Sequence, residues 1–208
     1  MIELFSGTPG SGKSFHACQR IYYWLQTGWN IIANFPCNFP ETYQEKKMRG
    51  KFEYVPNDKL TVKYLVDFAK ANHKERKEHQ TLIIIDEAGI KFNARCWRDS
   101  DRFEWLNFLS QHRKFGFDIV MIAQADLMLD KQMRQFIEIE HNHRLMKSCG
   151  KMGYCLSLAF NFLDVKMWYG IKLPLGNEYI RYSKKIANIY DSYSLFDESW
   201  NEVVENGK

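Results

Sequence analysis

Near its start the chain carries the motif Gly7-Thr8-Pro9-Gly10-Ser11-Gly12-Lys13-Ser14. It matches the pattern G-x-x-x-x-G-K-[ST] at every fixed position, and the short apolar run Ile2-Glu3-Leu4-Phe5 comes directly before it. After the motif, apolar residues recur at three- and four-residue steps until Gly28: Cys18, Ile21, Tyr22 and Leu25. This spacing predicts a helix with one buried face. The motif therefore stands between a strand and a helix, which is the context of a phosphate-binding loop.

The residue types of this stretch fit the binding of a nucleoside triphosphate. Its three glycines allow backbone conformations in which successive N–H groups point at one anion, and the following helix adds its positive end. Lys13 is expected to reach the β- and γ-phosphates, and the Ser14 hydroxyl to ligate Mg²⁺. The predicted nucleotide-binding residues are Gly7, Thr8, Pro9, Gly10, Ser11, Gly12, Lys13 and Ser14.

A second motif is the apolar run Thr81-Leu82-Ile83-Ile84-Ile85, which ends abruptly in Asp86 and Glu87. Such a run predicts a parallel strand covered on both faces, with the two acids at its carboxyl end. The phosphate-binding loop should leave the sheet at the same edge. Asp86 is then the second predicted metal residue, and Glu87 is the predicted base that polarises the attacking water. The alternative is a strand that merely ends in acids before a turn.

Two further catalytic residues are proposed from their positions. Gln124 follows the predicted strand Phe117–Ala123 and could sense the γ-phosphate or orient the lytic water. Arg113 lies at the end of the helical pattern 101–115 and could act as an arginine finger in a neighbouring subunit. An ordinary hydrogen-bonding glutamine and a surface arginine remain open as alternatives for these two positions.

Charge, cysteine content and hydropathy bear on the partners and the cellular compartment of the protein. Lysine and arginine exceed aspartate and glutamate by 29 − 25 = 4, an excess that is compatible with nucleic acid but does not require it. The five cysteines form no C-x-x-C pair, which favours a reducing cytosol. His141, His143, Cys149 and Cys155 lack a standard zinc spacing, so ordinary alternation along a strand is favoured there. No apolar run approaches the roughly 20 residues of a membrane span, and no signal peptide is evident.

The remaining patterns predict one α/β domain. A second buried strand is expected over Ile31–Phe35, a solvated loop over Glu41–Lys51, and a helix after Thr61 that ends in the charged run Asn72–His79. Further strands are expected over Phe136–Glu140, Tyr154–Leu163 and Trp168–Leu173, the last two as an antiparallel pair. The residues from 197 to the end form a polar, acidic tail.

Together these features resemble the additional-strand, catalytic-glutamate branch of the P-loop ATPases. More narrowly, the chain is similar to the Zot-like family, named for zonula occludens toxin, which includes the gene I assembly proteins of filamentous phages. The likeness covers about nine-tenths of the chain and is carried by four stretches: Gly7–Ser14, Leu82–Ala88, Gln111–Ile119 running into Ala123-Gln124, and Ile189–Tyr193.

The resemblance implies a three-layer sandwich with a mostly parallel central sheet and a short C-terminal β extension, the ATPase domain over residues 1–195 and a polar tail over 196–208. It implies an ATP- and Mg²⁺-dependent hydrolase of phage assembly and virion extrusion, working as a homo-oligomeric ring at the cytoplasmic face of the host inner membrane. The implied partners are phage assembly or coat proteins, with single-stranded DNA as a further candidate. Family members continue into a transmembrane helix, so membrane association would come through a partner or a C-terminal segment missing from this chain.

Two other functions remain open from the residues alone. The phosphate-binding loop also suits a small-molecule or nucleotide kinase, although no Arg-rich lid segment is evident and Asp86-Glu87 favours water as the acceptor. The other alternative is a non-hydrolysing module that uses the nucleotide as an assembly switch.

Overall fold

The computed structural model of the protein describes residues 1–39, 48–93 and 99–190. The strands are β1 (Ile2–Ser6), β2 (Asn30–Ala33), β3 (Phe52–Tyr54), β4 (Thr81–Ile85), β5 (Phe117–Ile122), β6 (Ile139–Leu145), β7 (Phe162–Trp168) and β8 (Pro174–Ile180). The α-helices are α1 (Lys13–Thr27), α3 (Val62–Asn72), α4 (Ala88–Lys91), α5 (Asp99–Gln111), α6 (Lys131–Arg134), α7 (Gly150–Leu156) and α8 (Lys184–Ala187). Two 3₁₀ turns, η1 (Asp126–Met128) and η2 (Met146–Ser148), complete the described elements.

Within the described residues, the strands form one sheet in the order β3-β2-β4-β5-β1-β6-β7-β8. The pairs from β3 to β6 are all parallel, whereas β6–β7 and β7–β8 are antiparallel. β5 lies between β1 and β4, which is the position of the additional strand. The expectation of a mostly parallel sheet with an antiparallel extension near the C-terminus is therefore confirmed.

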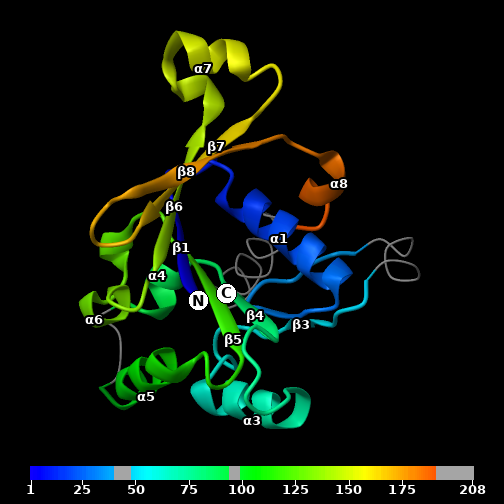
Figure 1. Ribbon diagram of the computed structural model, residues 1–208, viewed down its shortest axis with the longest axis vertical. Coiled ribbons are helices and arrows are strands. Elements are labelled where there is room, and N and C mark those ends of the chain that lie inside the picture. Colours follow the sequence, from blue (N-terminus) through cyan, green and yellow to red (C-terminus); the bar gives the residue numbers. More distant parts are fainter. Residues whose placement is uncertain (40–47, 94–98, 191–208) are drawn as a thin grey trace, which may run out of the picture.

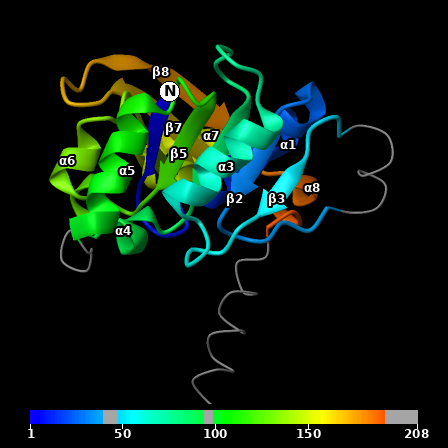
Figure 2. The ribbon, with the colours of Figure 1, turned by 90° about the horizontal axis from the view of Figure 1, so that it is seen from below.

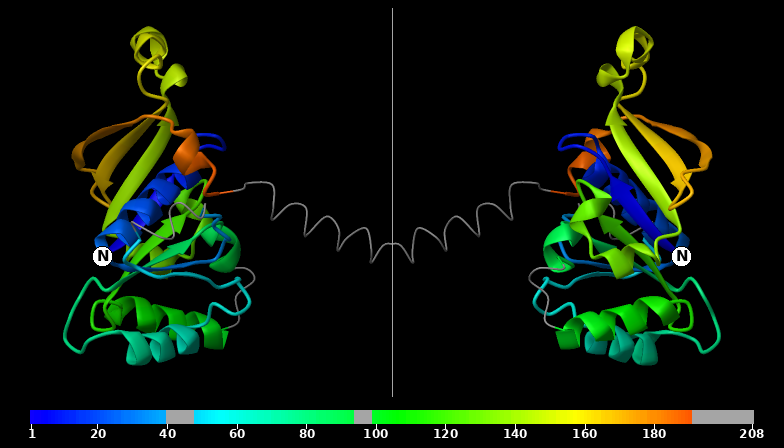
Figure 3. Two further views of the ribbon diagram at one scale, coloured as in Figure 1. Left: turned by 90° about the vertical axis from the view of Figure 1, so that its right-hand side faces the viewer. Right: turned by 90° about the vertical axis from the view of Figure 1, so that its left-hand side faces the viewer.

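Helices cover both faces of the parallel part of the sheet (Figure 2). On one face, α3 and α5 pack through Leu65, Phe108 and Leu109 against side chains of β1, β4 and β5. On the other face, the buried side of α1 includes Ile21 and Leu25, and Ile186 of α8 joins the same cluster. Figure 3 shows these layers edge-on, with α1 and α8 on one side of the sheet and α3 and α5 on the other. The near-continuous burial of β1, β4 and β5 follows from this double cover.

The first helix and the Asp86 strand form as expected from the sequence. α1 ends at Gly28, whose φ of 94° is the left-handed conformation that a glycine C-cap supplies. α3 begins after Thr61, whose side chain accepts a hydrogen bond from the backbone N–H of Tyr64. It ends at Asn72, so the charged run Asn72–His79 follows the helix rather than continuing it. The His73 ring instead bonds the Phe115 carbonyl and the Thr81 hydroxyl.

The sequence-based boundaries are wrong in the C-terminal third. The apolar positions around Phe136 and Ile137 belong to the chain after α6, where Ile137 packs in the core, and β6 begins only at Ile139. The predicted strand Tyr154–Leu163 is divided between α7 and the start of β7. The predicted strand Trp168–Leu173 is mostly the turn that joins β7 to β8, where Gly170 and Lys172 have positive φ.

The structure contains one short strand that the sequence pattern does not predict, and parts of two expectations lie outside the described residues. The short strand β3, which pairs with β2, is not predicted from the sequence because three residues are too few to show a period of two. Residues 41–47 of the expected loop Glu41–Lys51, and the tail from Asp197, lie outside the described residues. None of the helices in the described part of the chain combines the length and apolar character needed to cross a bilayer.

Candidate nucleotide-binding site

The loop between β1 and α1 has the backbone of an anion cradle. Gly7, Gly10 and Gly12 all have positive φ, at 135°, 75° and 96°, in a region that residues with side chains rarely adopt. Space also excludes a side chain at two of them. A Cβ on Gly7 would lie 2.3 Å from the His143 carbonyl oxygen, and a Cβ on Gly12 would lie 2.6 Å from the Phe162 ring. The loop is therefore held closely against β6 and β7.

Lys13 and Ser11 show that this loop suits a phosphate ligand. The Lys13 ammonium donates to the carbonyls of Gly7 and Thr8, at 2.9 and 3.1 Å, and so lies over the loop. Burial lowers the pKa of Lys13, while the charges of Asp86 and Glu87 act in the opposite direction. The Ser11 hydroxyl is buried, and no hydrogen-bond partner for it is found among the described residues. An anion in the loop would supply the acceptor that this hydroxyl lacks.

The β4 strand brings Asp86 to the start of α1. The Ser14 hydroxyl and the Asp86 Oδ2 are 3.5 Å apart although 72 residues separate them in the chain. A hydroxyl and a carboxylate are oxygen ligands of the kind that Mg²⁺ prefers, so these two side chains fit the metal of a nucleotide complex. Burial raises the pKa of Asp86, against the hydrogen bonds from Glu87 N–H, Tyr190 and Ser14 and the charge of Lys13. A cation at this site would offset the cost of burying the carboxylate.

Two partners of Asp86 were not assigned a role from the sequence. The Asn34 side chain accepts from the Asp86 backbone N–H at 2.7 Å and donates to its carbonyl at 2.8 Å, which fixes the end of β4 against the end of β2. The Tyr190 hydroxyl donates to the Asp86 Oδ2 at 3.2 Å. Asn34 could have been found as a polar residue at the end of a predicted strand. Tyr190 lies in the stretch Ile189–Tyr193, but nothing local in that stretch indicates a contact 104 residues away.

Glu87 occupies a strained position at the edge of the site. Its φ is 49°, a left-handed conformation that is uncommon for a residue with a side chain, and it directly precedes α4. Unlike Asp86, it is exposed. Partial desolvation of the carboxylate by nearby protein atoms, followed by the charge of Asp86, raises the pKa of Glu87, and the charge of Lys13 acts against this. The conformation turns Glu87 away from the path of the strand, and residues in such conformations cluster at functional sites.

Gln124 lies at the same edge, whereas Arg113 does not. The Gln124 carbonyl accepts from the Gly7 N–H at 3.3 Å, and its residue is exposed just after β5. Arg113 follows α5 and pairs with Glu138 at 2.8 Å, and Glu138 also accepts from the Ile2 N–H at the start of β1. Because the phosphate-binding loop leaves the other end of β1, about 16 Å away along the strand, Arg113 cannot reach the nucleotide site of its own chain.

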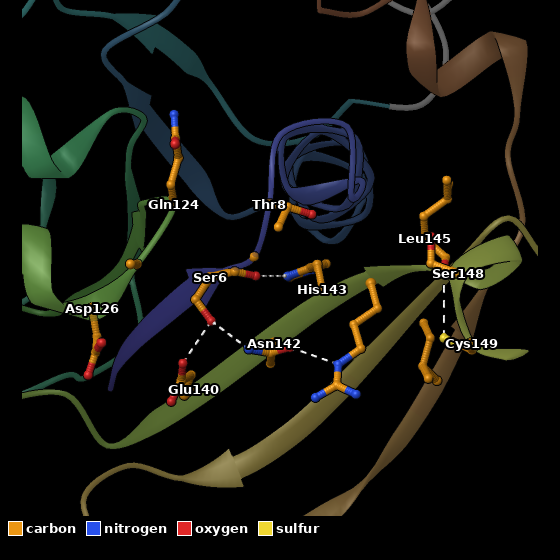
Figure 4. Close-up of a pocket in the computed structure, with 14 residues that line it drawn as sticks. Ser6, Thr8, Gln124, Asp126, Glu140, Asn142, His143, Leu145, Ser148 and Cys149 are labelled. Carbon is orange, nitrogen blue, oxygen red and sulfur yellow. Dashed lines mark hydrogen bonds between the residues drawn. The ribbon is translucent and has the colours of Figure 1, made fainter.

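An open cavity of about 740 Å³ lies beside the loop, between the end of β1 and β6 (Figure 4). Thr8 and Gln124 line it on the loop side, and Asn142 and Arg144 line it on the β6 side. The Ser6 hydroxyl donates to Glu140 at 2.7 Å below it. The cavity reaches from the phosphate-binding loop toward the base of α7, where Ser148 and Cys149 line it.

A buried histidine cluster supports the loop from beneath. The rings of His16 (α1) and His143 (β6) are 2.8 Å apart between Nδ1 and Nε2, and His141 Nδ1 donates to Asp164 of β7 at 2.6 Å. Burial lowers the pKa of His16 to about 4 and that of His143 to about 3. Both rings are therefore neutral near pH 7.

Among the described residues, the group that could share an ion is His16, His143 and Asp164, and neither Cys149 nor Cys155 belongs to it. The nitrogen separation of 2.8 Å between His16 and His143 is a hydrogen-bond length. Two nitrogen ligands of a tetrahedral zinc ion would be about 3.3 Å apart. The arrangement is that of a hydrogen-bonded cluster beneath the phosphate-binding loop.

Comparison with known proteins places this chain in a family. The family model for the zonular occludens toxin (Zot) matches residues 1–195. The chain belongs to the Zot family.

Relatives agree with the family assignment. This Zot-family chain is 28% identical over 226 residues to the Gene 1 protein of Enterobacteria phage fd, an alignment that covers 98% of the chain and 62% of the relative. The chain therefore spans about three-fifths of the length of this relative.

Solved structures agree with the fold. The N-terminal domain of zonular occludens toxin from Neisseria meningitidis is similar at a TM-score of 0.56, with 18% identity, over 91% of this chain and 98% of that one. The genome packaging NTPase B204 from Sulfolobus turreted icosahedral virus 2, in complex with ATP-gammaS, gives a TM-score of 0.56 at 13% identity, over 87% and 98% of the two chains. The fold is thus that of a P-loop NTPase.

Proposed function

We propose that this chain binds ATP with Mg²⁺ and hydrolyses it to drive the assembly and extrusion of filamentous phage particles. The observation that supports this most directly is the contact between Ser14 and Asp86, because it unites the phosphate-binding loop and the acidic strand end around one place for a metal. The B204 structure with ATP-gammaS supports ATP as the nucleotide class, and the Gene 1 relatives support the phage-assembly role.

Each residue of the site has a role in this proposal. The N–H groups of the loop 7–14 and the Lys13 ammonium hold the phosphates, while Ser14 and Asp86 hold the metal. The metal, when bound, neutralises charge that develops on the phosphate oxygens. Glu87 accepts the proton of the attacking water, and Gln124 orients that water. The exposed position of Glu87 next to Asp86 suits it to this task better than Asp86 itself, whose oxygens already accept hydrogen bonds.

The active form is proposed to be a ring of identical subunits at the cytoplasmic face of the host inner membrane. Arg113 is proposed as the residue that completes the site of a neighbouring subunit, since it cannot reach its own. Phage assembly or coat proteins are the proposed partners, with single-stranded DNA as the cargo inside the coat. Attachment to the membrane is proposed to come through a partner or through a segment beyond this chain.

The Glu87→Gln substitution tests hydrolysis at this site. Gln keeps the size of the side chain but cannot accept a proton, so ATP should still bind while turnover falls by about a hundredfold or more. Equilibrium binding of ATP and steady-state phosphate release measure the two effects separately. Glu75→Gln, at an exposed glutamate outside the site, is the matched control and should change neither.

Three results would contradict the proposal. Unchanged turnover in Glu87→Gln would remove Glu87 from the mechanism. Tight ATP binding by the unaltered protein with no hydrolysis at any protein concentration would instead identify a nucleotide-dependent assembly module. Acceleration of ADP release by a metabolite far above the rate with water would identify a kinase.

A further inference from the structure

The connection between β6 and β7 projects from the body of the molecule and ends in α7 (Figure 1). We call residues 144–160 the tip. Its neck is closed by a hydrogen bond from the Met146 N–H to the Asn161 carbonyl at 2.9 Å. Inside the tip, Met146 is 1% exposed, and Gly153 packs so closely that a Cβ would lie 2.5 Å from the Met146 carbonyl oxygen. The tip is thus a packed structure with an interior of its own.

Large apolar side chains nevertheless cover the outside of the tip. Met152 is 78% exposed, Tyr154 67% and Leu158 93%, and Leu145 and Leu156 are also exposed. Because Met146 and Gly153 already fill the interior, these side chains are not required for the packing of the tip. Exposed apolar residues that gather on one projecting element mark a surface for a partner.

The charges of the tip have one sign. Arg144, Lys147 and Lys151 are all exposed. Between Glu140 and Asp164 the sequence contains no acidic residue, although aspartate and glutamate number 25 in the whole chain. A surface with basic side chains around an apolar end complements an anionic lipid bilayer, in which headgroup phosphates attract the cations and the acyl boundary accepts the apolar residues.

The side-chain types favour lipid over nucleic acid. Single-stranded nucleic acid is bound by aromatic platforms on which bases stack, set in a positively charged groove. The most exposed large apolar residues of the tip are instead Leu158 and Met152, which offer no face for stacking, and Tyr154 is the only aromatic residue among the exposed large apolar residues of the tip. We propose that the tip inserts into the headgroup region of an anionic membrane and adds a lipid contact of this domain's own to the attachment through a partner or a further segment.

The base of the tip borders the cavity beside the phosphate-binding loop, through Arg144 and Ser148. The outer side chains that would contact lipid do not line that cavity: Lys147, Lys151, Met152 and Leu158. Lipid contact by these side chains is therefore separate from the proposed ATPase activity. The tip is connected to the nucleotide site through β6, since the carbonyl of His143, one residue before the tip, lies against Gly7. The tip that contacts lipid would therefore be continuous with β6, and β6 packs directly against the phosphate-binding loop.

Flotation of the whole chain with lipid vesicles, without nucleotide, tests the proposal. Vesicles of phosphatidylcholine mixed with phosphatidylglycerol should bind the protein about tenfold or more better than vesicles of phosphatidylcholine alone, because each basic residue adds to the attraction. The double substitution Met152→Ser/Leu158→Ser should weaken binding to the mixed vesicles by about tenfold or more. Lys147→Glu/Lys151→Glu should do the same, and added salt should weaken binding by the unaltered protein.

The matched control is Ile171→Ser, at a side chain that is 74% exposed in the turn at the opposite end of β7. It should leave vesicle binding unchanged. Because all the altered side chains are exposed, unfolding curves of the variants should match that of the unaltered protein and show that the tip variants are folded. Loss of ATP turnover plays no part in this assay, so a failure here is distinct from a failure of the proposed hydrolysis.

Several outcomes would overturn the proposal. Absence of binding to mixed vesicles, or binding that survives both tip substitutions, would show that the tip does not contact lipid. Equal loss in Ile171→Ser would show that the apolar residues of the tip have no special part. Binding of a single-stranded oligonucleotide that the tip substitutions abolish, without vesicle binding, would assign this surface to nucleic acid.

Discussion

At the scale of single residues, Tyr190 is the least expected member of the site. Its hydroxyl donates to the same Asp86 oxygen that lies 3.5 Å from the Ser14 hydroxyl. In sites of this kind, the partners of a metal-ligating carboxylate orient it for the metal.

Replacing Tyr190 with Phe removes this hydrogen bond and keeps the ring. We expect the Mg²⁺ concentration for half-maximal ATP turnover to rise by about tenfold or more, since loss of a partner of a metal ligand typically has this effect. Titration of Mg²⁺ at saturating ATP measures it. Tyr182→Phe, at a tyrosine that is 46% exposed, is the control. An unchanged Mg²⁺ requirement in Tyr190→Phe would show that the contact does not orient Asp86.

At the scale of elements, the phosphate-binding loop depends on the antiparallel extension beside it. Gly7 lies against the backbone of β6, and Gly12 lies against the Phe162 ring of β7. Gly10 has positive φ as well, but a Cβ there would meet nothing within 4 Å. The three glycines therefore serve different purposes: all of them relieve backbone strain, and two of them also permit close packing.

Gly12→Ala should consequently destabilise the protein more than Gly10→Ala. Both substitutions place a side chain at positive φ, at a cost of about 1–2 kcal/mol, but only Gly12→Ala also forces the Phe162 ring to move, at about 1–3 kcal/mol more. Urea unfolding of the nucleotide-free protein measures the difference. In a Phe162→Leu background the extra cost should shrink, and equal destabilisation by the two substitutions would contradict the packing argument.

The buried histidine cluster predicts how stability depends on pH. An imidazole in the unfolded chain has a pKa near 6.5. Burial lowers the pKa of His16 to about 4 and that of His143 to about 3 in the fold. Between about pH 6.5 and these lower values, the unfolded chain binds more protons than the folded one, so the free energy of unfolding falls as the pH decreases.

The loss should amount to about 1.4 kcal/mol per pH unit for each histidine once the pH is below about 6. Urea unfolding at a series of pH values between about 7.5 and about 5 measures the slope. His16→Asn should reduce the slope by the contribution of one histidine, whatever its effect on the free energy of unfolding at neutral pH. A slope that His16→Asn does not alter would show that the fold does not lower the pKa of His16.

For the whole molecule, the position of Arg113 bears on whether a single subunit is active or whether subunits of an assembly share nucleotide sites. The arginine lies at the sheet edge opposite the phosphate-binding loop and is 51% exposed beside Glu138. An exposed ion pair of this kind contributes about 0–1 kcal/mol to stability, so its loss should leave the fold intact. If subunits share sites, one face of each subunit supplies the loop and the opposite face supplies Arg113.

Mixing two inactive variants tests this arrangement. Arg113→Ala subunits keep a complete loop, and Lys13→Ala subunits keep the arginine, so ATP turnover should return when the two are mixed at a protein concentration that supports assembly. Phosphate release across a series of mixing ratios is the measurement. No recovery at any ratio, or full activity of Arg113→Ala alone, would place the completion of the site elsewhere.

The part of the fold around the phosphate-binding loop could be predicted from residue patterns. Gly7–Ser14 and Thr81–Glu87 predicted their strands and their common edge because both motifs combine a strict residue pattern with a buried strand. The helix α1 and its glycine stop followed from spacing alone. These features are local, since a loop that must bind phosphate and a strand covered on both faces restrict residue types within a few neighbouring positions.

The remaining features depend on contacts between distant parts of the chain. Asn34 and Tyr190 reach Asp86 across 52 and 104 residues, and no local pattern records such contacts. The C-terminal strands were misplaced because the apolar residues of α7 and of the turn around Ile171 face outward, so their spacing does not follow the period of a buried sheet face. Burial restricts the sequence strongly where a residue packs in the core, and weakly where chain topology or an outward-facing surface determines its place.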